Sequence, residues 1–162
     1  MRAIIQRVKR ASVSVDAKVV GHIDAGLVVF VGVHKEDTRT EADWLAEKIA
    51  HLRVFSDADG KFNLSLLDTG GAVLLVSQFT LYGEVRRGRR PSFSDAASPE
   101  LAEPLLVYLE SALKRQGELR VATGRFQAHM LVEILNDGPV TISLDTAVTR
   151  SGRIKQELPA GG

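Results

Sequence analysis

The chain contains no cysteine among its 162 residues. Disulfide bonds, thiolate metal sites and cysteine nucleophiles are therefore excluded, and the composition fits a reducing compartment. Long apolar runs are also missing, since the longest, Ala25 to Val33, is far too short to span a bilayer. Polar residues interrupt the start of the chain, which lacks the apolar core of a signal peptide. We therefore expect a soluble cytoplasmic protein without a membrane partner.

Several catalytic and cofactor motifs are absent as well. The sequence has no P-loop, no G-x-G-x-x-G after a strand and no G-x-S-x-G nucleophile elbow. The four histidines share no metal-ligand spacing. Residues 57–60 show the alternating acidic residues of a calcium loop, but the later ligands are missing, so a β-turn with Gly60 in a left-handed conformation is favoured. We expect no metal and no cofactor.

The chain does have the composition of one ordinary globular domain. It is 44% hydrophobic and 25% charged, which is enough to bury a core without cross-links. The net charge is only +1, but four arginines gather in one short stretch. Such local positive charge can hold phosphates, although a solvated loop explains the composition equally well. These arginines are Arg86, Arg87, Arg89 and Arg90.

Hydrophobic periodicity predicts a single α+β domain over residues 1–162, with 158–162 as a frayed tail. Short apolar or alternating runs predict strands, and two segments with helical spacing predict helices. The order of these segments favours a barrel-like sheet, mixed or mostly antiparallel, with two main helices packed on it. The predicted strands are 2–8, 12–15, 19–23, 26–33, 72–81, 131–135 and 140–144.

Capping signals predict the helix boundaries. The first helix is expected to begin at Thr38 or Thr40, because each has an acidic residue three positions later that can complete a capping box. The second helix is expected to open near Pro99. Pro104 should kink this helix or mark its true start, and Gly117 should end it.

A polar cluster, Ser77-Gln78-Phe79-Thr80-Leu81, follows the apolar run 72–76. Side chains that donate and accept hydrogen bonds at the end of a buried strand indicate a functional site. If the strand continues, Gln78 and Thr80 point into the same space. Amides, hydroxyls and backbone N–H groups can form an oxyanion hole, and an activated Thr hydroxyl can attack an ester. A strand end whose polar groups are simply satisfied explains the same pattern.

A second cluster, residues 136–141, contains Gly138-Pro139 between two predicted strands. Glycine lets another backbone approach closely because it has no Cβ, and proline lacks the N–H of a strand ladder. Only about 5–6% of X-Pro bonds in folded proteins are cis, so the residues alone favour a trans bond. In the cis form, the two carbonyl groups would make a rigid pair of acceptors that reads the shape of a ligand.

These two clusters match the defining signatures of a known family. Residues 77–81 read S-Q-F-T-L, and residues 136–141 fit N-x-G-P-x-T. Together with further matched segments, they make the chain resemble the D-aminoacyl-tRNA deacylases nearly from end to end. The further segments are 1–3, 6–8, 26–33, 48–49, 52–53, 55, 59–61, 82–83, 88–93, 123–124, 126 and 130.

The resemblance implies a homodimer that hydrolyses the ester between a D-amino acid and the terminal adenosine of tRNA, and that also acts on glycyl-tRNA. It implies a cis Gly138-Pro139 bond that reaches into the site of the other subunit. There it would act as a filter that leaves no room for an L side chain, so that specificity comes from rejection. The implied catalytic residues are Ser77, Gln78, Phe79 and Thr80; the implied binding and filter residues are Gly138, Pro139, Met130 and Arg7; the candidate tRNA contacts are Arg86, Arg87, Arg89 and Arg90.

Two mechanisms remain open for such a site. Either Thr80 is the nucleophile, with the Gln78 amide or backbone N–H groups as oxyanion donors, or the 2′-hydroxyl of the terminal ribose helps to activate water. The second is favoured because no base neighbours Thr80 in the sequence. Two other functions fit the same residues: a non-catalytic RNA-binding domain with this fold, and a small-molecule esterase or amidase that uses Thr80.

Overall fold

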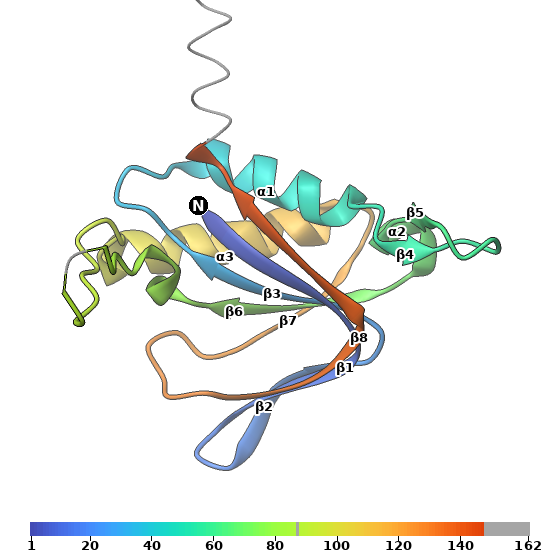
Figure 1. Ribbon diagram of the computed structural model, residues 1–162, viewed down its shortest axis with the longest axis horizontal. Helices are drawn as coiled ribbons and strands as arrows, with labels where there is room; N and C mark the ends of the chain where they lie inside the picture. Colours follow the sequence, from blue (N-terminus) through green and yellow to red (C-terminus); the bar gives the residue numbers. More distant parts are fainter. Residues whose placement is uncertain (87, 148–162) are drawn as a thin grey trace, which may run out of the picture.

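A computed structural model describes residues 1–86 and 88–147, and it shows a layer of helices on a strongly curved sheet (Figure 1). Helices α1 (Arg39–His51) and α3 (Pro99–Arg115) lie side by side on one face. The short helix α2 (Leu66–Thr69) lies beside a small β4–β5 hairpin. The strands are β1 (Arg2–Val15), β2 (Lys18–Ile23), β3 (Gly26–Gly32), β4 (Phe55–Ser56), β5 (Phe62–Leu64), β6 (Ala72–Ser77), β7 (Arg120–Thr123) and β8 (Leu131–Asp145).

The main sheet is mixed and almost closes into a barrel. Strand β1 pairs antiparallel with β2, β3 and β8, whereas β3 with β6 and β6 with β7 are parallel. Strand β2 approaches β7 so closely that a Cβ added to Gly21 would lie 2.5 Å from the carbonyl oxygen of Thr123. This contact therefore requires glycine. The predicted α+β class, barrel-like mixed sheet and two main helices are confirmed.

Strands β3 and β6 form the centre of the core. Nearly all of their residues are buried, because both faces of these strands are covered. On one face Leu27 and Val29 pack in a cluster with residues of α1 and α3. On the other face Val28 and Leu74 belong to a second cluster inside the curved sheet. Burial on both faces explains why these strands are continuous apolar runs in the sequence.

The capping signals predict the helix ends well. Thr38 is the N-cap of α1, and its backbone N–H donates to Glu41 Oε2 at 2.8 Å to complete the capping box. Helix α3 begins at Pro99, so Pro104 lies inside the helix and does not mark its start. Gly117 follows α3 with φ of 83°, the left-handed conformation expected of a residue that ends a helix.

In two places, two strands predicted one after the other form one continuous strand. The segments 2–8 and 12–15 form one strand, β1, and the segments 131–135 and 140–144 form one strand, β8. Gly138-Pro139 was expected in a turn between strands, but it lies within β8 as an irregularity at which the register with β1 shifts. A bulge bends a long strand without ending it. The residues at this bulge, glycine and proline, are also typical of turns, so the sequence suggests a turn.

Two further strand predictions need correction. The strand predicted over 72–81 ends at Ser77, because residues Phe79–Tyr82 form a 3-10 turn, η1. Strand β7 was not predicted from the sequence. Its four residues are half-buried or exposed and show no alternating pattern. The segment is a strand because it pairs with β6, and its own sequence does not indicate one.

Within residues 1–86 and 88–147, no group of three acidic or histidine side chains is arranged to hold a metal ion. Gly60 has φ of 76°, as predicted, and the Asp57 carboxylate accepts from the N–H groups of Asp59 and Lys61 in the same turn. No helix in this part of the chain is long and apolar enough to cross a membrane. The predicted frayed tail, 158–162, lies outside the described residues.

Candidate active site

The first polar cluster lies where β6 gives way to η1. The N–H of Gln78 donates to the carbonyl of Val31 at 2.7 Å and continues the ladder by one residue. The chain then turns, and the Gln78 side-chain amide donates to the hydroxyl of Thr80. The predicted alternation along a strand is therefore wrong, but the two side chains do share one space. A tight turn, rather than an extended strand, brings them together.

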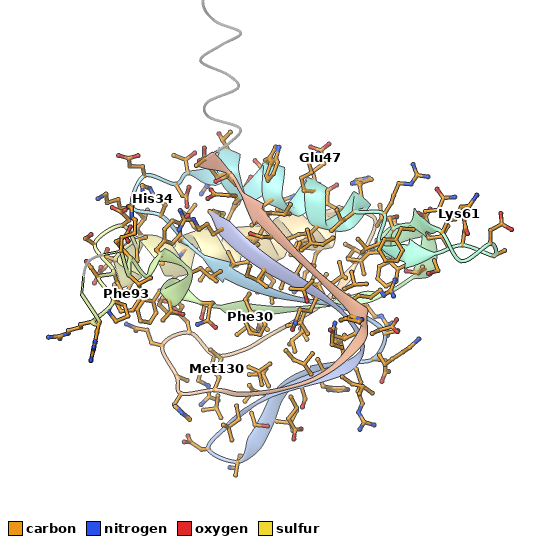
Figure 2. All side chains as sticks on the ribbon, in the orientation of Figure 1. Phe30, His34, Glu47, Lys61, Phe93 and Met130 are labelled. Atoms are coloured by element: carbon orange, nitrogen blue, oxygen red, sulfur yellow. The ribbon has the colours of Figure 1, made fainter. Side chains whose placement is uncertain are left out.

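A cavity of about 690 Å³ opens beside this turn. Its volume lies in the range of small-ligand sites. Ser77, Gln78, Phe79 and Met130 line it, so four of the predicted site residues meet there. The other lining residues are Val76, Phe93, Ala96, Ala97, Pro99, Ala102, Phe126, Gln127, Ala128, His129 and Val132. Figure 2 shows Phe93 on the loop after η1 and Met130 close to the start of β8.

Thr80 is exposed next to the cavity and is not part of its lining. In the described part of the chain, its hydroxyl accepts a hydrogen bond from the Gln78 amide, and no histidine, carboxylate or lysine forms a hydrogen bond with it. A hydroxyl needs a neighbouring base or a lowered pKa to act as a nucleophile. The geometry therefore provides a positioned hydroxyl without an activating group.

The second polar cluster is held by side chains of its own neighbourhood. The Gly138-Pro139 bond is cis, which confirms that expectation of the resemblance. The Asn136 amide donates to the carbonyls of Arg7, at 2.8 Å, and Val140, at 3.3 Å. A Cβ added to Gly138 would lie 2.7 Å from the nitrogen of Val140, so no other residue fits this conformation. Gly138 and Pro139 themselves face solvent.

Arg7 is a buried arginine that connects the second cluster to the rest of the fold. Its Nε donates to the carbonyl of Asp137 at 3.2 Å and lies 3.2 Å from the Asp137 carboxylate. Its Nη1 donates to the carbonyl of Val54, and its guanidinium lies over the ring of Phe62, 5.2 Å from the centroid. A guanidinium with several donors can fix neighbouring main chain in this way.

Within one chain, the two clusters lie far apart. Ser77 pairs with Val31 of β3. Val31 faces Ala3 of β1, which in turn faces Leu144 of β8. Gly138 lies in the bulge between Thr141, which faces Gln6, and Asn136, which faces Val8, so it is about four residues of β1 away from Leu144, roughly 13 Å along the sheet. Strands β6 and β8 are also three strand spacings apart, roughly 14 Å across the sheet, so the two clusters are separated by about 20 Å in all. Figure 1 accordingly shows η1 and the bend of β8 at opposite ends of the sheet. One chain alone therefore does not combine the two clusters into one site.

The arginine-rich segment forms a loop between η1 and α3. Backbone hydrogen bonds between Glu84 and Ser92, of 2.8 and 3.0 Å, close its base. The side chain of Arg86 donates to Glu84 Oε2 at 2.7 Å, and together with the Arg86 backbone N–H it lowers the pKa of the Glu84 carboxyl to about 2. Arg89 and Arg90 are exposed, and they have no ion pair with the described residues. Arg87 lies outside the described residues.

The sequence analysis did not assign a site role to three residues that the structure brings into these clusters. Phe93 and Phe126 line the cavity, and Asn136 holds the Gly138-Pro139 segment. All three lie in the matched segments, but single aromatic residues in loops carry no periodic signal. Only the folded arrangement shows that Phe93 lies 5.0 Å from Phe79, ring centroid to ring centroid.

Residues 4–145 match the protein family described as D-Tyr-tRNA(Tyr) deacylase. The D-aminoacyl-tRNA deacylase of Roseiflexus castenholzii is 56% identical over 157 residues, which are 97% of this chain and 99% of that protein. The D-aminoacyl-tRNA deacylase of Thermus aquaticus is 58% identical over 147 residues, 91% of this chain and 96% of the relative. These matches define a class, the hydrolases that remove an acyl group from tRNA. Within it, the chain belongs to the D-Tyr-tRNA(Tyr) deacylase family.

Solved structures have the same fold. A structure of a protein called c-Myc DNA unwinding element binding protein is 41% identical, with a TM-score of 0.84 over 90% of this chain and 98% of that one. A probable eukaryotic D-amino acid tRNA deacylase is 17% identical, with a TM-score of 0.78 over 89% of this chain and 98% of that chain. The second match, at this low identity, supports the fold alone.

Proposed function

We propose that this protein hydrolyses the ester bond of D-aminoacyl-tRNA and so removes D-amino acids from tRNA before translation. The observation that carries the proposal is that Ser77, Gln78 and Phe79 open into one cavity with Met130, in a chain that belongs to this family. The cavity takes the terminal adenosine, and the aminoacyl ester lies at the Gln78–Thr80 turn. We name Ser77, Gln78, Phe79 and Thr80 as the residues that bind and position the ester.

In the reaction, the oxygen of a water molecule adds to the ester carbonyl carbon and forms an oxyanion. The bond between this carbon and the 3′-oxygen of the ribose then breaks, and the 3′-oxygen takes up a proton. The products are the free D-amino acid and tRNA with a 3′-hydroxyl. Donors that face the oxyanion lower the barrier, and the Gln78 amide and the first N–H groups of η1 are the candidates in this turn.

The 2′-hydroxyl of the terminal ribose is the group we assign to the activation of water. This assignment rests on the contacts of Thr80. Its hydroxyl accepts a hydrogen bond from Gln78, and in the described part of the chain no side chain that could act as a base forms a hydrogen bond with it. Thr80 then holds the Gln78 amide in place and does not form a covalent intermediate.

Chiral selection is assigned to Gly138 and Pro139 of a second subunit in a homodimer. The separation of about 20 Å within one chain supports an arrangement in which each site combines the two clusters from different subunits. The segment faces solvent, and Arg7 and Asn136 fix its main chain. A rigid main chain can exclude an L side chain, whereas the hydrogen of glycine passes the same steric test. Glycyl-tRNA is therefore a second expected substrate.

Exposed arginines of the loop after η1 are assigned to the tRNA phosphates, with Arg89 and Arg90 as the principal contacts. Arg86 is a weaker candidate because Glu84 already engages it. Arg87 remains a candidate by sequence alone. Because aminoacyl-tRNA is used at the ribosome, the proposal places the protein in the cytoplasm.

The test measures release of amino acid from D-tyrosyl-tRNA, L-tyrosyl-tRNA, glycyl-tRNA and free D-tyrosine methyl ester. Hydrolysis of D-tyrosyl- and glycyl-tRNA, with neither of the other two consumed, supports the proposal. Binding of all three tRNAs without turnover would identify a non-catalytic RNA-binding domain. Cleavage of the free ester at a comparable rate would identify a small-molecule esterase.

A further inference from the structure

Two phenylalanines stand in contact at the rim of the cavity. The rings of Phe79 and Phe93 meet edge to face, with centroids 5.0 Å apart and planes at 67°. Phe79 is 58% exposed and Phe93 is 36% exposed, although both are large apolar side chains. A Cβ added to Gly83 would lie 3.2 Å from Phe93 Cε1, so glycine at this position lets the chain pass closely under the ring.

The pair is anchored to the fold from two sides. Phe79 begins η1 directly after the site residues Ser77 and Gln78. Phe93 follows the backbone bridge between Glu84 and Ser92 that closes the base of the arginine-rich loop. The loop that carries the exposed Arg89 and Arg90 therefore lies along the chain between the two phenylalanines, and both rings line the cavity.

We infer that the Phe79–Phe93 pair stacks the base of the penultimate nucleotide of the tRNA. This inference rests on the proposed function. With the terminal adenosine in the cavity and the phosphates at the arginines, the preceding nucleotide crosses the rim where the two rings are exposed. Aromatic side chains beside a positively charged surface are the usual means of holding single-stranded nucleotides, and each stacked base contributes about 1–3 kcal/mol.

The test uses short RNA hairpins that carry D-tyrosine on a normal 3′ end or on one with an abasic penultimate position. For the wild type, kcat/KM should fall about 5- to 150-fold on the abasic RNA. Phe93→Leu, which keeps an apolar side chain but removes the ring, should lose a similar factor on the normal RNA and little more on the abasic RNA. Phe93→Tyr keeps the ring face and should retain wild-type rates. Trp44→Leu, on α1 and away from the cavity, serves as the control for loss of an aromatic residue.

Equal rates of the wild type on both RNAs would overturn the inference, and this comparison needs no protein variant. A loss by Phe93→Leu that is the same on both RNAs would also overturn it. If that loss came with dissociation of the dimer in sedimentation experiments, the rings would pack against the second subunit instead of a base. If the wild type hydrolysed neither RNA nor intact D-tyrosyl-tRNA, the proposed function itself would be wrong, which is a different outcome.

Discussion

Thr80 is the residue on which the two mechanisms differ. In the substrate-assisted mechanism its hydroxyl only positions the Gln78 amide. Thr80→Ala then removes a contact of about 1 kcal/mol, so the single-turnover rate on D-tyrosyl-tRNA should fall about 5- to 10-fold. Removal of a true nucleophile costs about 10⁴-fold or more. A rapid-quench measurement of the single-turnover rate separates these two values.

The substrate provides the matching control for Thr80. A D-tyrosyl-tRNA that ends in 2′-deoxyadenosine keeps the 3′ ester but lacks the neighbouring hydroxyl, and the wild type should hydrolyse it far more slowly. Thr80→Ser, which keeps the hydroxyl, should behave as the wild type. Near-complete loss of turnover by Thr80→Ala, with binding unchanged, would contradict the substrate-assisted mechanism and make Thr80 the nucleophile.

Arg7 is the second residue with a specific expected effect. Its buried guanidinium bonds to the main chain of Val54 and Asp137. Arg7→Met keeps most of the side-chain volume but leaves these carbonyls without their donor, so the free energy of unfolding should fall by about 2 kcal/mol. Because the same contacts fix the Gly138-Pro139 segment, the ratio of D- to L-tyrosyl-tRNA hydrolysis should fall by about one to two orders of magnitude.

Arg10→Met is the matched control on the same strand. Arg10 is exposed, so its replacement should change stability by less than about 0.5 kcal/mol and leave the chiral ratio unchanged. Denaturant unfolding gives the stability, and parallel assays on the two aminoacyl-tRNAs give the ratio. An Arg7→Met protein that is destabilised but fully selective would limit Arg7 to a structural role.

At the scale of elements, the loop between η1 and α3 contains a carboxyl group, that of Glu84, which is expected to titrate at an unusually low pH. The carboxyl of Glu84 has its pKa lowered from 4.5 to about 2 by the Arg86 side chain and backbone N–H. A lowered carboxyl pKa means that the pairing is fully present above pH 4.5 and is lost as the pH falls from 4.5 toward 2. Carboxyl ¹³C shifts should show this midpoint, and Arg86→Gln should return it toward 4.5.

Because Glu84 pairs with Arg86, the arginines of this loop should contribute unequally to the affinity for RNA. Each phosphate contact that is lost reduces the slope of log K against log salt by about 1. Arg89→Gln and Arg90→Gln should each produce this reduction, because the two side chains are exposed and unpaired among the described residues. Arg86→Gln should reduce the slope less, since Glu84 already neutralises this guanidinium. Equal slopes for all variants and the wild type would remove the loop from the tRNA interface.

An element can be predicted from the sequence when its own residues carry the pattern, and it is missed when contacts elsewhere in the fold determine it. The central strands β3 and β6 are predictable because burial on both faces leaves a continuous apolar run. The turn after Ser77 is not, because the run Gln78 to Leu81 alternates as a strand would and only the folded chain reveals the 3-10 turn. Strand β8 is missed for a related reason: a bulge at Gly138-Pro139 and a turn share the same residue types.

The composition of the candidate site follows the same division. The motifs identify Ser77 to Thr80 and Gly138-Pro139, because their polar or unusual residues break the local strand pattern. They give no role to Phe93, which is a lone aromatic residue in a loop, or to Asn136, although Asn136 belongs to the second motif, because only the fold shows what these two side chains contact. Nor does the pattern reveal that the two motifs are about 20 Å apart in one chain, since this separation depends on the register across four strands.

At the scale of the whole molecule, that separation makes a direct test of the dimer available. A closed two-fold dimer repeats the same contact twice, so each Gly138-Pro139 segment would meet the cavity of the other subunit. Because the chain has no cysteine, Thr141→Cys and Gln127→Cys introduce the only thiols. Thr141 is exposed close to Gly138, and Gln127 is exposed at the cavity. A short bismaleimide should join a Thr141→Cys subunit to a Gln127→Cys subunit and give a covalent dimer on a denaturing gel.

The choice of two separate single variants makes the result specific to the arrangement between subunits. Neither variant can form this cross-link within its own chain, and each variant treated alone reports any bridge between two identical positions. A covalent dimer that appears only in the mixture therefore requires the segment of one subunit at the cavity of the other. Glu47→Cys, on the exposed side of α1 (Figure 2), replaces Gln127→Cys as the control and should give no product. If the mixture gave no covalent dimer while the unlabelled protein was active, or if Glu47→Cys reacted equally, the filter would have to lie outside Gly138 and Pro139. Selection against L substrates would then be a property of the 690 Å³ cavity itself.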